Sequence, residues 1–373
     1  MAVRPLVVGI DGRELVGRPT GTGRYLRNLL RHWRDSGDEL LVYFNGPPAL
    51  DPVLEHPAVR KRPLGDGCAR GLVWQEWILP RAAAADAIDV FFSPAYSCPL
   101  RLDRPRVTAV HDLSFFAHPQ DFTLVDALRR RALVAASLRA SSRVPVCSDF
   151  TARELARLFP DLAGRAVHIP LGADGDWPPS PPRGEARRGL GVTGPFILAV
   201  GAILNRRCVP ELLRAVVRLR DRHPGLVLDL VGENRTHPRL DLEALVASLD
   251  LRPYVRLSGF VEDAELALRY AAADAFVSLS EYEGFGLPAL EAAKHGLPLV
   301  VGRAPSQGEI FREAALLVDS RDEAEVAHAL DRALSDGATR EALVDAGRAL
   351  AARHSWAETA RLTREALLDA ACR

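Results

Sequence analysis

Short apolar segments alternate with helical patterns along the chain, and this rhythm constrains the fold more than any other feature. The first example is the apolar run at residues 6–10, which is followed by a glycine-rich turn and a helical pattern through residues 25–33. Apolar runs of this length between helices are typical of buried strands in a parallel sheet covered on both faces. The sequence therefore predicts an α/β fold with doubly wound sheets. Further runs in the first half lie at residues 40–44, 88–92, 107–110 and 143–147.

A proline-rich stretch divides this pattern into two halves. Trp177 is followed by Pro-Pro-Ser-Pro-Pro, which is typical of a linker. A chain of 373 residues is long for one core and suits two domains. Apolar runs resume after the stretch, at residues 196–200, 226–231, 255–257, 275–278 and 299–301. We expect a first domain over 1–172, a linker over 173–190, a second domain over 191–355, and a C-terminal helix over 356–373 that is able to pack back on the first domain.

Composition argues against several classes of protein. The 48 basic and 48 acidic side chains cancel, so no overall basic excess points to a nucleic-acid partner. The five cysteines are scattered and form no CxxC pair, which fits a reducing compartment without a zinc site. No uninterrupted apolar run reaches the roughly 18 residues of a membrane span, and no export signal is recognisable. We therefore expect a cytoplasmic protein.

An acidic, glycine-containing segment is the strongest functional signal. Glu283 precedes the residues Gly-Phe-Gly-Leu-Pro, and Glu291 lies eight positions further on. A strand, a glycine turn and a helix start would leave the N–H groups of Phe285, Gly286 and Leu287 free to bind a phosphate. The two glutamates would then accept hydrogen bonds from hydroxyls on either side of it. The alternative is that these carboxylates only complement the helix dipole.

Three other segments follow predicted strands. Arg206 and Arg207 lie in the loop after residues 196–200 and suit a diphosphate, although adjacent arginines are also common on solvated surfaces. Gly21 and Gly23 open a predicted helix, where the backbone can approach a ligand or simply form a tight turn. His111 directly follows the strand at 107–110, and a histidine there serves either a site or the core.

The acidic segment resembles the E-x7-E motif of the retaining glycosyltransferases of family 4, which have the GT-B fold of two Rossmann-like domains facing a central cleft. The flanking Glu-Gly-Phe-Gly-Leu-Pro and Gly-Leu-Pro strings are similar too. The resemblance implies that Glu283 approaches the transferred sugar and Glu291 the nucleotide ribose. It also implies that the backbone of residues 285–287 holds phosphate.

Two further segments of the second half resemble the same family but depart from its pattern. Where relatives commonly have Arg-Lys-Asn, this chain has Arg206, Arg207 and Cys208, so a wide guanidinium replaces a compact ammonium. The resemblance implies that both arginines neutralise the leaving diphosphate. Glu309 stands where relatives have the glutamate of Pro-Glu and is expected to help to fix the nucleotide, but Gly308 replaces the proline.

In the first half, the string Pro-Thr-Gly21-Thr-Gly23-Arg-Tyr is similar to a family segment that contacts the donor phosphate or sugar. His111 begins a His-Asp-Leu segment that also resembles the family. The resemblance implies that His111 lies near the donor sugar and orients the reacting sugars rather than acting as an obligate base. The matches extend to about residue 319 and so cover most of the chain.

The resemblance also implies the reaction. A hexosyl group moves from a nucleotide-diphosphate sugar to a glycan or lipid-linked acceptor, with front-face transfer and retention of configuration. GDP-mannose is the first choice of donor, ahead of UDP sugars, because similar proteins build bacterial surface polysaccharide. The string Asp174-Gly-Asp176 matches a metal-binding Asp-x-Asp, but it lies in the expected linker. We therefore predict neither a metal nor a cofactor.

A basic, helix-compatible stretch over residues 127–143 bears on the acceptor. It either lies against anionic lipid at the inner face of the membrane, as a peripheral contact, or forms an ordinary helix with arginines in water. Two other function classes also stay open. A sugar-nucleotide epimerase has a related fold but does not need the E-x7-E segment. A non-catalytic nucleotide-sugar-binding subunit would explain the departures at Ala202, Arg207, Cys208 and Gly308.

Overall fold

The chain forms two compact units in the computed structural model, which describes residues 4–17, 20–65, 71–175 and 177–372. Unit 1 consists of Met1–Phe116, Val125–Gly172 and Trp356–Arg373. Unit 2 consists of Ala117–Leu124 and Ala173–Ser355. Each unit is therefore assembled from segments that are distant in sequence.

Unit 1 contains a parallel five-stranded sheet in the order β3-β2-β1-β4-β5. Isolated bridges from Val107 to Arg143 and from Val110 to Val146 extend it toward a two-stranded sheet, β6-β7. The sequence did not predict β3, because this edge strand carries exposed charged side chains instead of an apolar run. The strands are β1 Val7–Asp11, β2 Glu39–Phe44, β3 Val59–Pro63, β4 Val90–Ser93, β5 Arg106–Thr108, β6 Val144–Val146 and β7 Ala166–His168.

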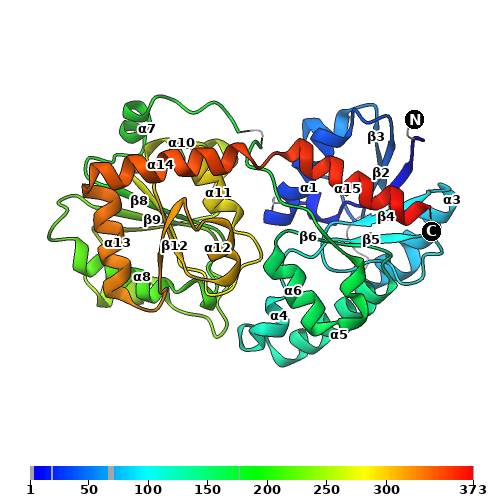
Figure 1. Cartoon of the computed structure of the whole chain (residues 1–373), viewed down its shortest axis with the longest axis horizontal. Helices are drawn as coiled ribbons and strands as arrows, with labels where there is room; N and C mark the ends of the chain where they lie inside the picture. Colours follow the sequence, from blue (N-terminus) through cyan, green and yellow to red (C-terminus); the bar gives the residue numbers. More distant parts are fainter. Residues whose placement is uncertain (1–3, 18–19, 66–70, 176, 373) are drawn as a thin grey trace. The chain divides into compact units, whose positions relative to one another are not determined.

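Helices cover both faces of this sheet. On one face, α3 and the π-helical turn η3 share a core cluster with Tyr43 and Phe91. On the other, the C-terminal α15 packs against α1, β4 and β5, as the red and blue helices of Figure 1 show. The helices lying wholly or mostly in unit 1 are η1 Arg13–Leu15, α1 Gly21–Trp33, η2 Pro52–Glu55, α2 Gly71–Val73, η3 Trp74–Ile78, α3 Leu79–Ala85, α4 Ser114–Ala117, α5 Leu124–Ala140, α6 Asp149–Leu158, η5 Pro160–Arg165 and α15 Trp356–Ala371.

Buried ion pairing fixes α15 in unit 1. The Arg364 guanidinium donates from Nε to Oδ2 of Asp38 at 2.6 Å and from Nη2 to Oδ1 at 2.8 Å. Asp38 also accepts the indole N–H of Trp33 at 2.9 Å. The hydroxyl of Thr359 donates to the carbonyl of Pro170 at 2.8 Å, and Trp356 is 1% exposed. The last helix is thus part of the unit 1 core.

Unit 2 contains a parallel six-stranded sheet in the order β10-β9-β8-β11-β12-β13. This is the 3-2-1-4-5-6 order of a Rossmann domain, with its switch point between β8 and β11. Just past β9, Gly232 has φ +144°, and a Cβ at this position would overlap with the carbonyl oxygen of Gly201. The strands are β8 Phe196–Val200, β9 Val227–Val231, β10 Val255–Gly259, β11 Ala275–Ser278, β12 Leu299–Gly302 and β13 Ala315–Val318.

The helices of unit 2 also form two layers. Helices α8, α9 and α13 contribute to one core cluster, whereas α10, α11 and α14 contact the strands separately and pair with other helices. Part of the expected linker, residues 173–190, folds as α7 and packs on α10. The helices are η4 Pro119–Asp121, α7 Arg183–Gly189, η6 Asn205–Arg207, α8 Val209–Leu219, α9 Leu242–Ser248, α10 Asp263–Ala272, α11 Leu287–Lys294, α12 Pro305–Ile310, α13 Glu323–Ser335 and α14 Gly337–Ala352.

Candidate functional site

The acidic segment lies at the switch point of unit 2, where β11 ends and α11 begins. Gly286 precedes α11 with φ +95°, and no side chain caps the helix. A Cβ at Gly286 would lie 3.2 Å from the Phe311 ring and 3.4 Å from Nε2 of Gln307, so both the conformation and the space favour glycine. The adjacent Phe285 is buried, and Leu287 is the first helical residue. An uncapped helix start of this kind offers N–H groups to an anion.

The Glu283 carboxylate is held by the protein on two sides. Its Oε2 accepts a hydrogen bond from the Ser280 hydroxyl at 2.9 Å and lies 3.3 Å from Nη2 of Arg207. The backbone carbonyl of Glu283 accepts the hydroxyl of Ser306, from the start of α12. The side chain therefore has a fixed position and a compensating positive charge.

Glu291 lies one turn into α11 and is 5% exposed. Its Oε2 accepts a hydrogen bond from the Tyr270 hydroxyl at 3.2 Å. A buried carboxylate needs such donors, because desolvation without them is costly. The sequence did not identify Tyr270, which belongs to α10.

The loop that carries Arg206 and Arg207 lies at the same carboxyl-terminal edge of the unit 2 sheet as the acidic segment. It follows β8, the other strand of the switch point, and Arg207 donates from Nη1 to the carbonyl of Val200 at 3.0 Å while contacting Glu283. Nε of Arg206 donates to the carbonyl of Tyr282 at 3.3 Å, and its Nη1 lies 3.6 Å from Oδ2 of Asp121. The loop and the acidic segment are therefore directly bonded.

The remaining predicted residue of unit 2, Glu309, is half-buried on α12. The same helix carries Ser306, which bonds Glu283, and Gln307, whose Nε2 donates to the Ser278 hydroxyl at 3.4 Å. Helix α12 thus supports the acidic segment through residues that the sequence analysis did not name.

Gly21 and Gly23 lie at the start of α1 in unit 1. The Thr20 hydroxyl caps this helix by accepting the N–H of Gly23 at 3.0 Å, and it donates to Oε2 of Glu14 at 2.8 Å. A Cβ at Gly23 would lie 2.5 Å from the Glu14 carbonyl oxygen, whereas Gly21 has open space. Residues 18 and 19 of the predicted segment lie outside the described residues. The close approach at Gly23 is thus made by the protein backbone.

His111 follows β5 in unit 1 and is partly buried between aromatic rings. Its ring lies edge-on to Tyr25, with centroids 4.8 Å apart. Nε2 lies 2.8 Å from the carbonyl oxygen of Pro94, so Nε2 must carry the hydrogen. Burial lowers the pKa of His111 below its ordinary value. The ring is therefore neutral near pH 7, with a lone pair on Nδ1.

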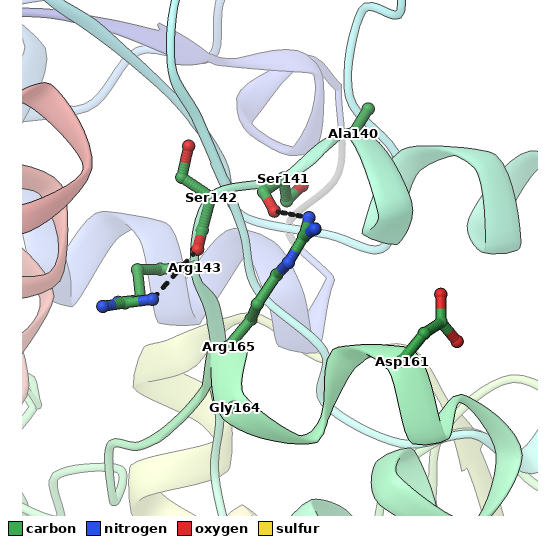
Figure 2. Close-up of a pocket in the computed structure, with 7 residues that line it drawn as sticks. All are labelled: Ala140, Ser141, Ser142, Arg143, Asp161, Gly164 and Arg165. Atoms are coloured by element: carbon green, nitrogen blue, oxygen red, sulfur yellow. Dashed lines mark hydrogen bonds between the residues drawn. The ribbon is translucent and has the colours of Figure 1, made fainter. Parts of the chain in front are cut away.

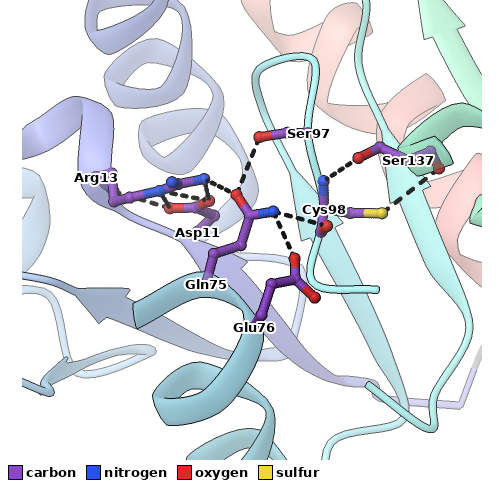
Figure 3. Close-up of polar contacts among 7 residues, drawn as sticks. All are labelled: Asp11, Arg13, Gln75, Glu76, Ser97, Cys98 and Ser137. Atoms are coloured by element: carbon purple, nitrogen blue, oxygen red, sulfur yellow. Dashed lines mark hydrogen bonds and ion pairs between the residues drawn. The ribbon is translucent and has the colours of Figure 1, made fainter. Parts of the chain in front are cut away.

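A polar network that the sequence analysis missed lies past β1 in unit 1 (Figure 3). Arg13 binds the Asp11 carboxylate through Nε and Nη2, and its Nη2 also donates to Oε1 of Gln75 at 2.9 Å. Gln75 is fully buried in the π-helical turn, accepts the Ser97 hydroxyl at 3.1 Å and donates to the Cys98 carbonyl at 3.0 Å. The charged string Asp-Gly-Arg directly after an apolar strand was the available signal.

A hollow of about 460 Å³ in unit 1 is lined by none of the predicted catalytic or donor-binding residues (Figure 2). Its arginines are occupied by the fold: Arg165 donates to the Ser141 carbonyl at 2.8 Å, and Arg143 pairs with Asp369 at 2.5 Å. We therefore assign this hollow to the scaffold. The cavity at the switch point of unit 2 is smaller, about 30 Å³, but it is lined by the candidate residue Arg207 and by the ends of β8 and β11.

Ser148 directly precedes α6 and caps this helix by accepting the N–H of Thr151 at 3.1 Å, so its hydroxyl serves the fold. Of the string Asp174-Gly-Asp176, residue 176 lies outside the described residues. Among the residues that are described, no three His, Cys, Asp or Glu side chains gather in a way that could hold a metal ion.

Comparison with known proteins gives consistent findings. Residues 19–177 match the family model described as Glycosyltransferase Family 4, and residues 184–350 match Glycosyl transferases group 1. O-antigen chain mannosyltransferase B of Escherichia coli is 30% identical over 359 residues, which cover 90% of this chain and 93% of that protein.

Solved structures agree on the fold. Sucrose-phosphate synthase from Thermosynechococcus elongatus has a TM-score of 0.79 at 22% identity, covering 97% of this chain and 98% of that one. Anabaena HepE, in complex with UDP and glucose, has a TM-score of 0.76 at 20% identity, covering 97% and 99%. These likenesses confirm the predicted fold class, the GT-B arrangement of two Rossmann-like domains.

Proposed function

Because this chain belongs to glycosyltransferase family 4, we propose that it moves a hexosyl group from a nucleotide-diphosphate sugar to a glycan or lipid-linked glycan with retention of configuration. That it is a hexosyltransferase using nucleotide sugars follows from the family. The observation that carries the finer proposal is the extended match to an O-antigen chain mannosyltransferase. Mannose from GDP-mannose is accordingly the first choice of donor.

The donor is assigned to the switch point of unit 2. The backbone N–H groups of Phe285, Gly286 and Leu287 bind the diphosphate, since the start of α11 lacks a side-chain cap and its dipole attracts anions. Arg206 and Arg207 neutralise the charge of the leaving group. No metal is part of this proposal.

The two carboxylates and Glu309 are assigned to the rest of the donor. Glu291 accepts hydrogen bonds from ribose hydroxyls, and Glu309 helps to fix the nucleotide. Glu283 accepts a hydrogen bond from a hydroxyl of the transferred sugar. Its contacts with Ser280 and Arg207 support this role, because they fix the position of the carboxylate. Rigid, preorganised acceptors stabilise a developing positive charge on the sugar better than mobile ones.

The proposed reaction takes place on one face of the sugar. The bond between the anomeric carbon and the diphosphate oxygen breaks, a bond to the acceptor oxygen forms, and the acceptor proton moves to the leaving phosphate oxygen. A double displacement would need a carboxylate nucleophile, as in retaining glycosidases. Glu283 is a poor candidate because its carboxylate is paired with Arg207 at 3.3 Å.

His111 and the start of α1 are assigned to sugar binding. Since the His111 ring donates from Nε2 to Pro94, its Nδ1 can accept a hydrogen bond from a sugar hydroxyl. The lowered pKa of His111 supports this neutral, orienting role over transfer of its own proton. Gly21, where a side chain would meet open space, is assigned to the same role because the backbone there is accessible to a sugar.

A peripheral membrane contact through α5 is proposed for delivery of a lipid-linked acceptor. The start of this helix exposes Leu124 by 76%, Val125 by 75% and Leu128 by 56%. Arg129 and Arg130 are also exposed, and this combination suits an anionic lipid surface. In the part of the chain that is described, no helix is both long and apolar enough to span a bilayer. Cosedimentation with phosphatidylglycerol vesicles that persists undiminished in Leu128→Glu would refute this assignment.

Donor binding and transfer are tested separately. A selective rise in melting temperature with one nucleotide diphosphate, in the presence of chelator, is expected from binding to the native state. The variant Glu283→Gln should then lose at least ~100-fold in transfer rate, the size of a lost transition-state contact, while nucleotide affinity stays within about threefold.

Glu281→Gln is the matched control, because Glu281 lies in the same loop but pairs with the exposed Arg321. It should keep nearly full activity. No stabilisation by any nucleotide would contradict the donor site. Full transfer activity in Glu283→Gln would contradict its role and favour a non-catalytic protein.

A further inference from the structure

Tyr270 contacts two parts of α11 that bear on the proposed donor site. Its hydroxyl lies 3.2 Å from Oε2 of Glu291 and 3.3 Å from the carbonyl oxygen of Pro288, in the first turn of the helix. Tyr270 is 1% exposed, so no solvent competes for these contacts. Helix α10 thus supplies a hydrogen-bond donor to the Glu291 carboxylate of α11.

Three aromatic neighbours fix the ring that carries this hydroxyl. The Tyr270 ring is stacked on His295, with centroids 4.8 Å apart and planes 7° from parallel. The Trp177 ring is nearly perpendicular to both rings, with its centroid 5.4 Å from that of Tyr270 and 5.3 Å from that of His295. Phe276 lies on the β11 side at 6.3 Å. With its ring packed in this way, Tyr270 holds its hydroxyl oxygen in one position, within hydrogen-bond distance of Glu291 and of the Pro288 carbonyl.

A fixed donor matters because Glu291 has little access to water. A glutamate side chain has three rotatable bonds, and a carboxylate at 5% exposure depends on protein donors for its orientation. A hydrogen bond to one oxygen selects one rotamer and sets the direction in which the carboxylate can accept further hydrogen bonds.

We propose that Tyr270 is a positioning residue for the nucleotide: its hydroxyl holds the Glu291 carboxylate in the orientation that accepts hydrogen bonds from the ribose hydroxyls of a nucleoside diphosphate. This inference rests on the proposed role of Glu291. It makes Tyr270 a determinant of the preference for ribonucleotides over analogues that lack these hydroxyls.

The test compares Tyr270→Phe with the unmodified protein. The dissociation constants of GDP and UDP and of their 2′,3′-dideoxy analogues are measured by calorimetry, together with kcat and KM for the sugar donor. We expect about tenfold weaker binding of the preferred ribonucleotide and a higher KM, because a hydrogen bond to a charged group is lost. We expect kcat to stay within about twofold and the dideoxy analogue to bind equally to both proteins.

Tyr254→Phe is the matched control, since Tyr254 is a partly buried tyrosine of the same unit that packs near Arg220. It should leave all these constants unchanged. A general structural effect of Tyr270→Phe would instead weaken ribonucleotide and dideoxynucleotide binding alike, and this result would overturn the inference.

Glu291→Gln separates this inference from the proposed function. If Glu291→Gln leaves ribonucleotide binding unchanged, the role of Glu291 is wrong and that of Tyr270 falls with it. If Glu291→Gln weakens binding but Tyr270→Phe leaves the ribose preference intact, only the role of Tyr270 is overturned. If both act through one carboxylate, the double variant should be no weaker than Glu291→Gln alone.

Discussion

The two units share the order of their first five strands but differ at the starts of α1 and α11, the helices that carry the candidate glycines. In unit 2, α11 begins at an uncapped glycine turn next to a buried glutamate. In unit 1, the Thr20 hydroxyl caps α1, and Gln75 links Arg13 to the neighbouring loops. At the start of α1, a side chain of unit 1 accepts a backbone N–H group. At the start of α11, unit 2 leaves the corresponding N–H groups for a ligand. The loops, and not the sheet topology, decide which unit is suited to an anionic donor.

The largest expected effect is a loss of stability on replacing Gly232, just past β9 in unit 2. An alanine there would place its Cβ against the Gly201 carbonyl oxygen in a backbone conformation that L residues avoid, so Gly232→Ala should destabilise the protein by about 4 kcal/mol. Gly191→Ala is the control, because φ there is +60° with nothing within 4 Å. It should cost only about 1 kcal/mol. Equal melting temperatures in the two variants, measured by calorimetry, would contradict this explanation.

A smaller loss of stability is expected from removing the Gln75 side chain of unit 1. Gln75→Ala leaves Arg13, Ser97 and the Cys98 carbonyl without a shared partner in a buried site, which should cost about 2 to 3 kcal/mol of unfolding free energy. Nucleotide affinity should not change, because the nucleotide and its diphosphate are assigned to unit 2. The exposed Gln120→Ala should change stability by less than about 0.5 kcal/mol. A loss of nucleotide binding in Gln75→Ala would break the division of roles between the units.

The smallest effect concerns the pH dependence contributed by His295 in unit 2. Burial, with a further contribution from the charge of Lys294, lowers the pKa of His295 to about 4. The unfolded chain, with an ordinary pKa of about 6.5, binds the proton more readily, so stability is fully present above pH 6.5 and is lost as pH falls toward 4. Between pH 7 and pH 5 the loss should be about 2 kcal/mol.

His295→Phe keeps a ring for Tyr270 to stack on but removes the titration. Its unfolding free energy, measured in urea across this pH range, should therefore fall less steeply than that of the unmodified protein. Identical slopes would show that His295 is not the titrating group.

Local patterns predicted much of the framework. The strands β8, β9 and β11 follow from the apolar runs at residues 196–200, 226–231 and 275–278. These features depend on neighbours in sequence. Helix α7 was missed because the proline-rich stretch before it dominated the interpretation of the whole segment.

The connections between candidate residues were not predictable in the same way. Arg207 and Glu283 are 76 residues apart, and Tyr270 reaches Glu291 from a different helix. Such contacts depend on how helices pack on the sheet, and no periodic pattern in one sequence encodes them. Gln75 was hidden because a polar residue in a helical pattern normally faces solvent, whereas the π-helical turn directs it into the core.

The place of α15 in unit 1 affects the order in which the protein can be completed during translation. A ribosome releases unit 2, which ends at Ser355, before it releases Trp356–Ala371. Until then Asp38 lacks its Arg364 partner, and the surface that Trp356 covers stays open. The unit that is synthesised first is therefore the last to be finished, which reverses the usual vectorial order for a two-domain chain. A nascent chain stalled short of α15 should expose an incomplete unit 1 to chaperones and proteases.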